Sequence, residues 1–458
     1  MDFSAANTEL WNPIVQVGTI AALILFANVL RRKIKFIRTS LMPTAVLAGF
    51  ILLIARTTGI LQINMEFCEK LTYHMLALGF IALSLRTPDK TETSAGVHGS
   101  KNGALIVATY MVQAFVGLTI SLILAYTLMP DFFKAGGILL PMAYGQGPGQ
   151  ANNVGSTYEA LGMIGGKSFG LSLAAVGYLV ACVVGVVYMN ILNRRGVINR
   201  VADKDEVSGS VTIDLFQDNN EIPVAQSVDK ASVQFALIMI IYLVTYLFTA
   251  GIVLVLNAIA PGVAKTVGTL LWGFNFIIGS IMASACRVLF THLKRFKLMN
   301  HQYQNNYLLS RISGLAFDLM IVAGIASIDI SDLSGYWLPF LLMAVLGGIA
   351  TFYFLLYMCK KLYRGYEYEG FFSMFGMLTG TLSSGVLLLR ELDPDLKTPA
   401  SENLITGSSF GIIFGAPVLL LVSFAAKNDG SVIWTLLLVA VYFTLLILFI
   451  FKGGKKNK

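Results

Sequence analysis

Charged residues are scarce in this sequence. Asp, Glu, Lys and Arg make up 13% of its 458 residues, whereas hydrophobic residues make up 56% and the mean hydropathy is +0.73. An average soluble domain carries about twice that charged fraction. The composition therefore excludes an ordinary soluble domain and predicts an all-α polytopic membrane protein.

Cysteines and catalytic motifs are also few. Four cysteines are scattered without the spacing of a disulfide framework or a metal site. The sequence contains no glycine-rich nucleotide loop followed by lysine, no His-Glu-x-x-His and no serine elbow in a suitable setting. We therefore expect neither an enzyme nor a bound cofactor. ATP-driven transport and intramembrane hydrolysis are disfavoured for the same reason.

Long apolar segments are what the sequence has in abundance. A membrane-crossing helix needs about 20 apolar residues, and by that measure we expect eleven spans. They cover approximately 12–30, 41–58, 70–86, 103–128, 166–193, 232–258, 264–286, 309–328, 334–359, 402–425 and 431–451. Two interrupted segments, about 132–160 and 366–392, do not fit simple spans, and we expect each to be a re-entrant hairpin.

The basic residues predict the orientation. Arg31, Arg32 and Lys33 follow the first span, which places the N-terminus outside and this loop in the cytoplasm. Counting alternate spans from there puts the C-terminus in the cytoplasm of a cell-membrane protein. The basic residues that this count places outside are Arg56, Lys70, Lys134, Lys167, Lys265 and Lys427. The formal charge of +8 is thus explained by cytoplasmic loops, without a nucleic-acid partner.

The order of the segments predicts an inverted repeat. Residues 1–193 would hold five spans and the first hairpin, and residues 232–425 five spans and the second. A polar cytoplasmic linker, 194–231, would join them, and 426–458 would add an extra C-terminal span with a basic tail. An odd number of crossings separates the halves, so they would lie upside down to one another, as in many secondary transporters.

Short matches support the repeat. Ala48-Gly49 followed by Arg56 matches Gly279-Ser280 followed by Arg287, and Ser168-Phe169-Gly170 matches Ser409-Phe410-Gly411. In the third and eighth spans, the stretch around His74 aligns with the stretch around Asp318. Generic membrane-helix composition is the alternative explanation for these matches.

The first hairpin contains the most unusual stretch, LLPMAYGQGPGQANNVGS at 139–156. Its closely spaced glycines and one proline cannot hold a regular helix. Broken backbone at membrane depth is tolerated where it lines a cavity, and transporters place substrate sites at such breaks. The predicted substrate-binding residues here are Gly145, Gln146, Gly147, Gln150, Asn152 and Asn153. A hairpin tip that merely satisfies its own helix ends is the alternative.

The second hairpin has its counterpart break at Gly380-Thr381-Leu382-Ser383-Ser384-Gly385. Ser383, Ser384 and Gly385 are its predicted substrate-binding residues. Exposed N–H groups at the start of a half-helix suit a substrate carboxylate. Hydroxyl and carbonyl oxygens suit an alkali cation, so Thr379 and Thr381 are candidate sodium ligands.

Two titratable residues fall in the middle of apolar spans. A carboxylate at membrane depth is costly unless it is paired, hydrated or neutralised. Asp318 is therefore a candidate ligand of a coupling sodium ion, or a proton carrier. His74, at the matching place in the third span, is a candidate proton or hydrogen-bond partner, although packing is the more common role of a lone histidine.

Taken with these motifs, the sequence resembles the bacterial glutamate:sodium symporter family. The resemblance rests on the small-residue spans that end at Arg56 and Arg287, LGFIALSLR at 78–86, the tip at 144–151 and the two Ser-Phe-Gly stretches. It implies a homodimer that takes up glutamate with sodium, a mobile core moving against a scaffold. Both tips depart from the family, whose first reads Gly-Gly-His-Gly-Thr and whose second reads Gly-Ala-Thr-Pro-Thr.

The sequence thus predicts a sodium-coupled symporter for glutamate or a related small amino or carboxylic acid, working by alternating access. A proton-coupled carrier or exchanger of another small organic anion, with Asp318 and His74 as the relay, is one alternative. A channel is another, since channels also contain hairpins that enter from opposite faces.

Overall fold

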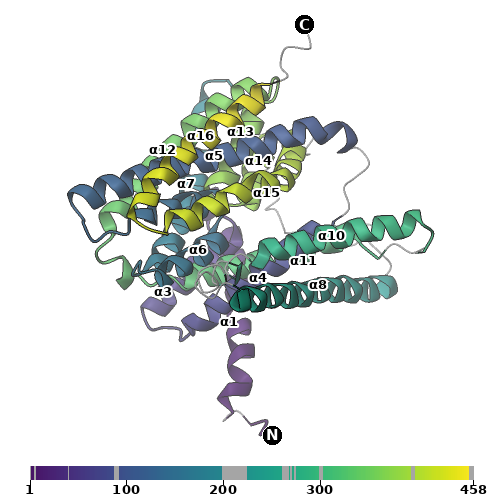
Figure 1. Cartoon of the computed structure of the whole chain (residues 1–458). Coiled ribbons are helices and arrows are strands. Elements are labelled where there is room, and N and C mark those ends of the chain that lie inside the picture. Colours follow the sequence, from purple (N-terminus) through teal and green to yellow (C-terminus); the bar gives the residue numbers. More distant parts are fainter. Residues whose placement is uncertain are drawn as a thin grey trace. The chain divides into compact units, whose positions relative to one another are not determined.

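The computed structural model describes residues 2–4, 7–39, 41–86, 92–198, 224–259, 268, 271–272, 275–298, 303–393 and 398–452. Every regular element in this part of the chain is a helix (Figure 1). The elements are α1 (Thr8–Lys33), α2 (Lys35–Thr39), α3 (Thr44–Thr57), α4 (Met65–Leu85), α5 (Glu92–Thr127), η1 (Lys134–Ile138), η2 (Pro141–Gly145), α6 (Pro148–Ala160), α7 (Gly166–Arg194), α8 (Val224–Ile259), α10 (Asn275–Arg295), α11 (Asn306–Ala326), η4 (Ser331–Leu333), α12 (Trp337–Leu362), α13 (Glu367–Thr379), α14 (Leu382–Arg390), α15 (Ala400–Ala425) and α16 (Asp429–Phe451).

The predicted membrane character is confirmed. Within the described ranges, nine helices are long and apolar enough to cross a membrane: α1, α5, α7, α8, α10, α11, α12, α15 and α16. The other two expected spans are helices as well: α3 is apolar but has 14 residues, and α4 has 21 residues with a more polar first half. Both hairpin segments are helical but interrupted. The all-helical polytopic architecture therefore follows from the apolar segments that the sequence displays.

The chain forms two compact units that do not coincide with the two predicted halves. Unit 1 contains Met1–Glu69, Thr91–Ala202 and Val322–Lys458, and unit 2 contains Lys70–Lys90 and Asp203–Ile321. Unit 1 thus holds both hairpins, one from each predicted half. The division of the sequence into halves stays a prediction, and most of the predicted linker lies outside the described residues.

Unit 1 is built around α5. This helix packs against α12, α15 and α16, and also against η1 and η2 of the first hairpin (Figure 1). Its backbone approaches the first hairpin closely: a Cβ added to Gly117 would lie 2.1 Å from the carbonyl oxygen of Gly137. No larger residue fits there, and the hairpin is therefore held directly against the central helix.

Unit 2 contains most of α4, together with α8, α10 and the first part of α11. Its buried cluster includes Ile81, Leu85, Ile238 and Leu309. A Cβ added to Gly79 of α4 would lie 2.5 Å from the ring of Phe317 in α11, and the Ser313 hydroxyl donates to the Gly79 carbonyl at 3.0 Å. The absence of a side chain at Gly79 thus lets these two helices cross closely.

Two arginines make the same kind of contact, one in each unit. In unit 1, Arg56 of α3 donates to the carbonyl of Ile328, just beyond the end of α11. In unit 2, Arg287 of α10 donates to the carbonyl of Arg86, just beyond the end of α4, at 3.0 Å. A cation is favoured at a helix C-terminus, where carbonyl groups lack helical partners. Each arginine therefore fastens the end of a neighbouring helix.

A glycine accompanies each arginine on the same helix. A Cβ added to Gly49 of α3 would lie 2.9 Å from Ile325, and one added to Gly279 of α10 would lie 2.9 Å from Ile81. Ile81 and Ile325 occupy the same place in the alignment that pairs His74 with Asp318.

All four cysteines are free thiols, in agreement with the absence of a disulfide pattern.

Candidate functional site

The first hairpin is broken at two residues, fewer than the glycine-rich stretch suggests. η2 is a single wide helical turn that ends at Gly145, and α6 begins at Pro148. Between them, Gly147 has φ +85° and ψ −175°, a conformation open essentially to glycine alone. The prediction that the whole stretch is irregular is wrong, because proline is well suited to the first position of a helix and restarts it at once.

The second hairpin is broken within the predicted stretch 380–385, but only at its first two residues. α13 ends at Thr379, the backbone is non-helical at Gly380 and Thr381, and α14 begins at Leu382. The two arms of this hairpin pack with almost no space between them, since a Cβ added to Gly385 would lie 2.5 Å from the carbonyl oxygen of Ser373. Gly385 is therefore a packing residue of the hairpin.

The two breaks meet inside unit 1. A Cβ added to Gly147 would lie 3.4 Å from the Thr381 methyl group and 3.6 Å from the Gly380 carbonyl oxygen. Gln113 of α5 joins them: its amide nitrogen donates to the Leu378 carbonyl at 2.8 Å, and its amide oxygen lies 2.9 Å from a Cβ added to Gly145. We call the residues at this meeting point, Gln113, 145–150 and 379–384, the tip junction.

Two helices start at the tip junction without a side-chain cap. The residue before α6 is Gly147 and the residue before α14 is Thr381, and neither supplies a capping hydrogen bond. The first N–H groups of a helix have no helical partner, and the helix dipole adds about half a positive charge there. The junction therefore presents two sets of N–H groups and positive potential, which is an arrangement suited to an anion.

Several buried polar side chains at or beside the tip junction lack partners. Among the described residues, no hydrogen-bond partner is found for the buried amide oxygens of Gln113, Gln150 and Asn152 or for the hydroxyls of Thr381 and Ser384. Gln150 and Ser384 are only 1% and 2% exposed. Leaving a buried polar atom unsatisfied costs about 1–3 kcal/mol. A cluster of such atoms at two uncapped helix starts is physically sensible if a polar ligand completes it.

The remaining predicted tip residues are placed as follows. Gln146 is half-buried and its amide contacts the Met142 sulfur at 3.7 Å, within its own turn. Asn153 is buried in α6. The Thr379 hydroxyl already donates to the Phe375 carbonyl at 2.7 Å, which leaves its lone pairs available as an acceptor. The side chain of Ser383 lies outside the described part of the structure.

The outer end of the first hairpin is fixed by charges. The backbone N–H of Lys167 donates to the Glu159 carboxylate at 3.1 Å, and the side-chain ammonium of Lys167 pairs with the Glu69 carboxylate at 2.6 Å. Partial burial raises the pKa of Glu159, and the bond from Lys167 opposes that rise. These contacts hold the turn between α6 and α7, and thereby the hairpin, in place.

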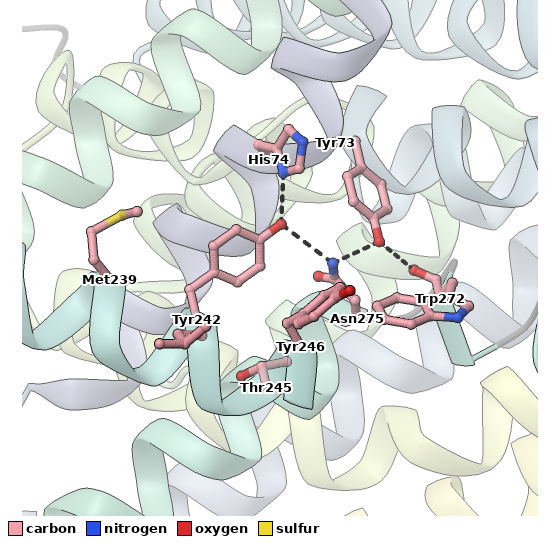
Figure 2. A pocket seen from close by; sticks show the side chains of 9 residues that line it. Tyr73, His74, Met239, Tyr242, Thr245, Tyr246, Trp272 and Asn275 are labelled. Carbon is pink, nitrogen blue, oxygen red and sulfur yellow. Dashed lines mark hydrogen bonds between the residues drawn. The ribbon is translucent and has the colours of Figure 1, made fainter. Parts of the chain in front are cut away.

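His74 lies in unit 2, at the edge of a cavity of about 430 Å³ lined mainly by aromatic side chains (Figure 2). Its Nδ1 is 2.7 Å from the Tyr242 hydroxyl, and the Asn275 amide donates to the hydroxyls of Tyr242 at 3.4 Å and Tyr73 at 2.6 Å. Tyr73 donates onward to the Trp272 carbonyl at 2.7 Å. His74 is thus a hydrogen-bond partner, as one of its two predicted roles requires, and its role in proton transfer stays a prediction.

Asp318 lies in α11, in unit 2, and its side chain is exposed rather than buried. It makes no hydrogen bond or ion pair with any residue in the described ranges. Those ranges also contain no cluster of three or more His, Cys, Asp and Glu residues that could hold a metal ion. Asp318 belongs to unit 2, whereas Thr379 and Thr381 belong to unit 1. The grouping of these three as ligands of one sodium ion stays a prediction.

Sequence reasoning missed Gln113 and the residues that hold the tips from behind. The Tyr144 hydroxyl donates to the Ala344 carbonyl at 2.7 Å, and Gln113 also donates to Thr351 at 3.0 Å. The available signal was Gln113 itself, because a neutral amide in the middle of an apolar span needs a partner.

No family model matches the chain, and no curated protein matches it.

Proposed function

We propose that this protein is a sodium-coupled secondary transporter that imports a small amino or carboxylic acid across the cytoplasmic membrane. The observation that carries the proposal is the tip junction. The breaks of two interrupted hairpins, at Gly147 and at Gly380–Thr381, lie next to each other at one buried point. There they offer two uncapped helix starts and a set of unpartnered oxygens.

Broken helices suit transport better than a purely structural role. In a helical membrane protein, each interruption forfeits backbone hydrogen bonds that have no water to replace them. Two interruptions at the same point, each at a residue where a longer side chain would be strained or crowded, are costly for stability alone. A transporter binds its solute and coupling ion at such breaks and opens the site alternately to each side of the membrane. This function would explain why the interruptions are retained.

The paired arginine contacts support the proposed inverted repeat. Arg56 and Arg287 follow matching sequence motifs, and each binds the end of a helix that the repeat assigns to the other half. Gly49 and Gly279 add close contacts with the matched residues Ile325 and Ile81. A repeat related by a two-fold axis produces such exchanged contacts in pairs. We propose on this basis that the two hairpins enter the membrane from opposite faces.

The remaining features of the proposal come from the sequence. We propose that the N-terminus lies outside and the C-terminus in the cytoplasm, and that the protein works as a homodimer in the lipid membrane. Sodium is the proposed coupling ion, with Asp318, Thr379 and Thr381 as its candidate ligands. Hydroxyl and carboxylate oxygens are the hard ligands that such a cation prefers.

The test is uptake by the purified full chain in sealed vesicles. Labelled amino acids and dicarboxylic acids are offered with an inward sodium gradient, with equal sodium on both sides, and with potassium in place of sodium. We expect saturable accumulation only with the sodium gradient. Movement of solute down its own gradient regardless of sodium would support a channel instead, and accumulation that ignores sodium would overturn the coupling.

A proton-coupled carrier is the second candidate, favoured by the hydrogen-bonded chain His74–Tyr242–Asn275–Tyr73 in unit 2. Histidine changes charge near neutral pH, and the Nδ1 of His74 can exchange a proton with the Tyr242 hydroxyl to which it is hydrogen-bonded. The same vesicles test it. Accumulation driven by an inward proton gradient without sodium, and lost in His74→Gln, would favour this candidate over the first.

A further inference from the structure

A second cavity in unit 2 is lined by basic and polar side chains. Its volume is about 350 Å³, and its lining residues are Arg86, Asn306, Tyr307, Ser310 and Arg311. All five belong to unit 2, so the cavity lies within one compact unit. Two of these described lining residues carry a positive charge and none carries a negative one. The lining therefore favours an anion.

The two arginines come from different elements. Tyr307, Ser310 and Arg311 are three and four residues apart in the first turns of α11, so they share one face of that helix. Arg86 follows directly after the end of α4. Its backbone is held in place because its carbonyl accepts the hydrogen bond from Arg287 at 3.0 Å. A ligand that contacts both guanidinium groups would thus join the end of α4 to α11.

Both guanidinium groups have N–H donors available for a ligand. In the described part of the chain, neither group pairs with a carboxylate. The Nε of Arg86 is buried and has no hydrogen-bond partner there. The Arg311 guanidinium lies over the Tyr307 ring, 5.1 Å from its centroid, and such a stack leaves the N–H groups at the edge of the guanidinium plane open. A buried donor without a partner is costly, and an acceptor on a ligand removes that cost.

The matching contact in unit 1 has a different environment. There Arg56 donates to the Ile328 carbonyl, and the charged residues that follow in the sequence are Asp329 and Asp332. The Asp332 carboxylate accepts from the Ser168 hydroxyl at 2.8 Å. This end of α11 is therefore acidic and bonded within the protein. Fastening a helix end with an arginine does not by itself require a pair of arginines around a cavity.

Two guanidinium groups suit a phosphate better than a carboxylate. A carboxylate has two oxygens, and one guanidinium can bond both of them in a bidentate pair. A phosphate has more acceptor oxygens and carries about one to two negative charges near neutral pH, which two arginines balance. The hydroxyls of Tyr307 and Ser310 lie at the same cavity. The cavity also exceeds a phosphate in size, so it has room for the molecule that carries the phosphate.

We propose that this cavity, which we call the arginine pocket, binds a phosphate group. Two sources share that chemistry, namely the headgroup of an anionic phospholipid and a soluble phosphate ester. On the proposed topology Arg86 and Arg311 lie on the cytoplasmic side, where basic pockets beside membrane helices meet anionic lipid headgroups. A phosphate bound there bridges α4 and α11 and stabilises unit 2. The arginine pocket contains none of the residues of the tip junction, so this role goes beyond the proposed transport.

The experiment measures binding to the purified full chain in a neutral detergent. A fluorescent phosphatidylglycerol is compared with a diacylglycerol that has the same acyl chains and the same dye but no phosphate. Glycerol 3-phosphate, the soluble counterpart of the headgroup, is tested as a ligand and as a competitor. We expect a phosphate-bearing probe to bind about tenfold or more tightly than the diacylglycerol, because charged donors form strong hydrogen bonds with it.

Variants locate the binding. Arg86→Gln combined with Arg311→Gln removes both guanidinium groups and should weaken phosphate binding about tenfold or more. Arg32→Gln combined with Arg38→Gln is the matched control, because it removes the same charge from two exposed arginines that do not line the pocket. Arg311→Lys keeps the charge but loses the bidentate geometry, and it should fall between the two. Arg311→Glu, at an exposed position, replaces the double variant if that variant does not fold.

The outcomes decide both the site and the source of the phosphate. Phosphatidylglycerol binding that requires Arg86 and Arg311 and resists excess glycerol 3-phosphate would establish a lipid headgroup site. Binding of glycerol 3-phosphate itself, with the same requirement, would establish a site for a soluble phosphate ester. If no phosphate probe binds, or if the pocket variants bind as tightly as the matched control, the arginine pocket is not a phosphate site. Sodium-driven uptake is measured separately, so neither result depends on the other.

Discussion

Gly147 illustrates how one residue determines the geometry of the tip junction. Its φ of +85° with ψ near 180° is a conformation that costs other residues about 1–3 kcal/mol. It separates η2 from α6 and brings the start of α6 against Thr381. The backbone turn and the meeting of the two hairpins therefore depend on the absence of a side chain at the same position.

Gly147→Val is expected to abolish uptake while the protein still inserts and remains monodisperse. The branched side chain would force the backbone out of its present conformation and press against Thr381. Gly162→Val is the matched control, because Gly162 also has a positive φ, +107°, but nothing lies within 4 Å of an added Cβ. Equal uptake by the two variants, measured per inserted molecule, would remove Gly147 from the site.

Asp318→Asn is expected to weaken the sodium dependence of uptake by at least tenfold in the sodium concentration for half-maximal rate. The amide is nearly the same size but supplies no negative charge to a cation. Asp131→Asn, which removes an exposed carboxylate just before η1, is the control. If sodium dependence in vesicles is the same for Asp318→Asn and the unaltered chain, Asp318 is not a sodium ligand.

At the residue scale, the sequence predicted which residues lie at the tips better than it predicted which residues they contact. Gly147, Gln150 and Ser384 could be singled out because glycine and neutral polar residues interrupt an apolar stretch. The sequence could not show that their polar atoms lack partners or that Gln113 bridges the two tips. Both features depend on contacts between residues more than 200 positions apart. The partner of His74 is likewise 168 residues away, in Tyr242.

At the scale of elements, the arginine contacts link helix ends to neighbouring helices in both units. Hydrogen bonds from a charged donor contribute about 1.5–3 kcal/mol each. The acceptors in both cases are carbonyl groups just beyond a helix end, which have no helical donor of their own. The contacts therefore replace a cap and join two helices at the same time.

Arg56→Gln and Arg287→Gln are each expected to lower the apparent unfolding temperature of the purified protein by several degrees. The two contacts share no residue, so the double variant should lose about the sum of the single effects. Arg32→Gln, which removes an exposed basic group at the end of α1, should change little. A thermal-unfolding series in which all three single variants match the unaltered chain would show that the paired contacts are not structural.

The existence of the helices was largely predictable, since a membrane helix must satisfy its backbone internally. Their bounds were less so: the span expected at 264–286 corresponds to α10 at Asn275–Arg295, and α5 begins at Glu92, eleven residues before the expected span. The break of the second hairpin was predicted at 380–385 but covers only Gly380 and Thr381. The break of the first hairpin was predicted at the right place but too wide. The prediction treated every glycine as a helix breaker, whereas α6 begins at Pro148 and includes Gly149.

At the scale of the whole molecule, an apolar helical fold holds one buried meeting point of two hairpins. The sequence predicted two matching halves, but the compact units combine elements of both. Such mixing cannot be read from sequence, because it depends on which helices exchange neighbours. The central claim is that the hairpins reach the tip junction from opposite faces of the membrane.

Sided labelling tests that claim most directly. Ile164, at the open end of the first hairpin, and Arg364, just before the second, are both exposed. Each is changed to cysteine, Ile164→Cys and Arg364→Cys, in a chain whose four native cysteines are replaced and whose uptake is retained. A maleimide that cannot cross the membrane should label the first only from outside and the second only from the cytoplasmic side. Labelling of both from one side would contradict the opposed hairpins and, with them, the proposed site.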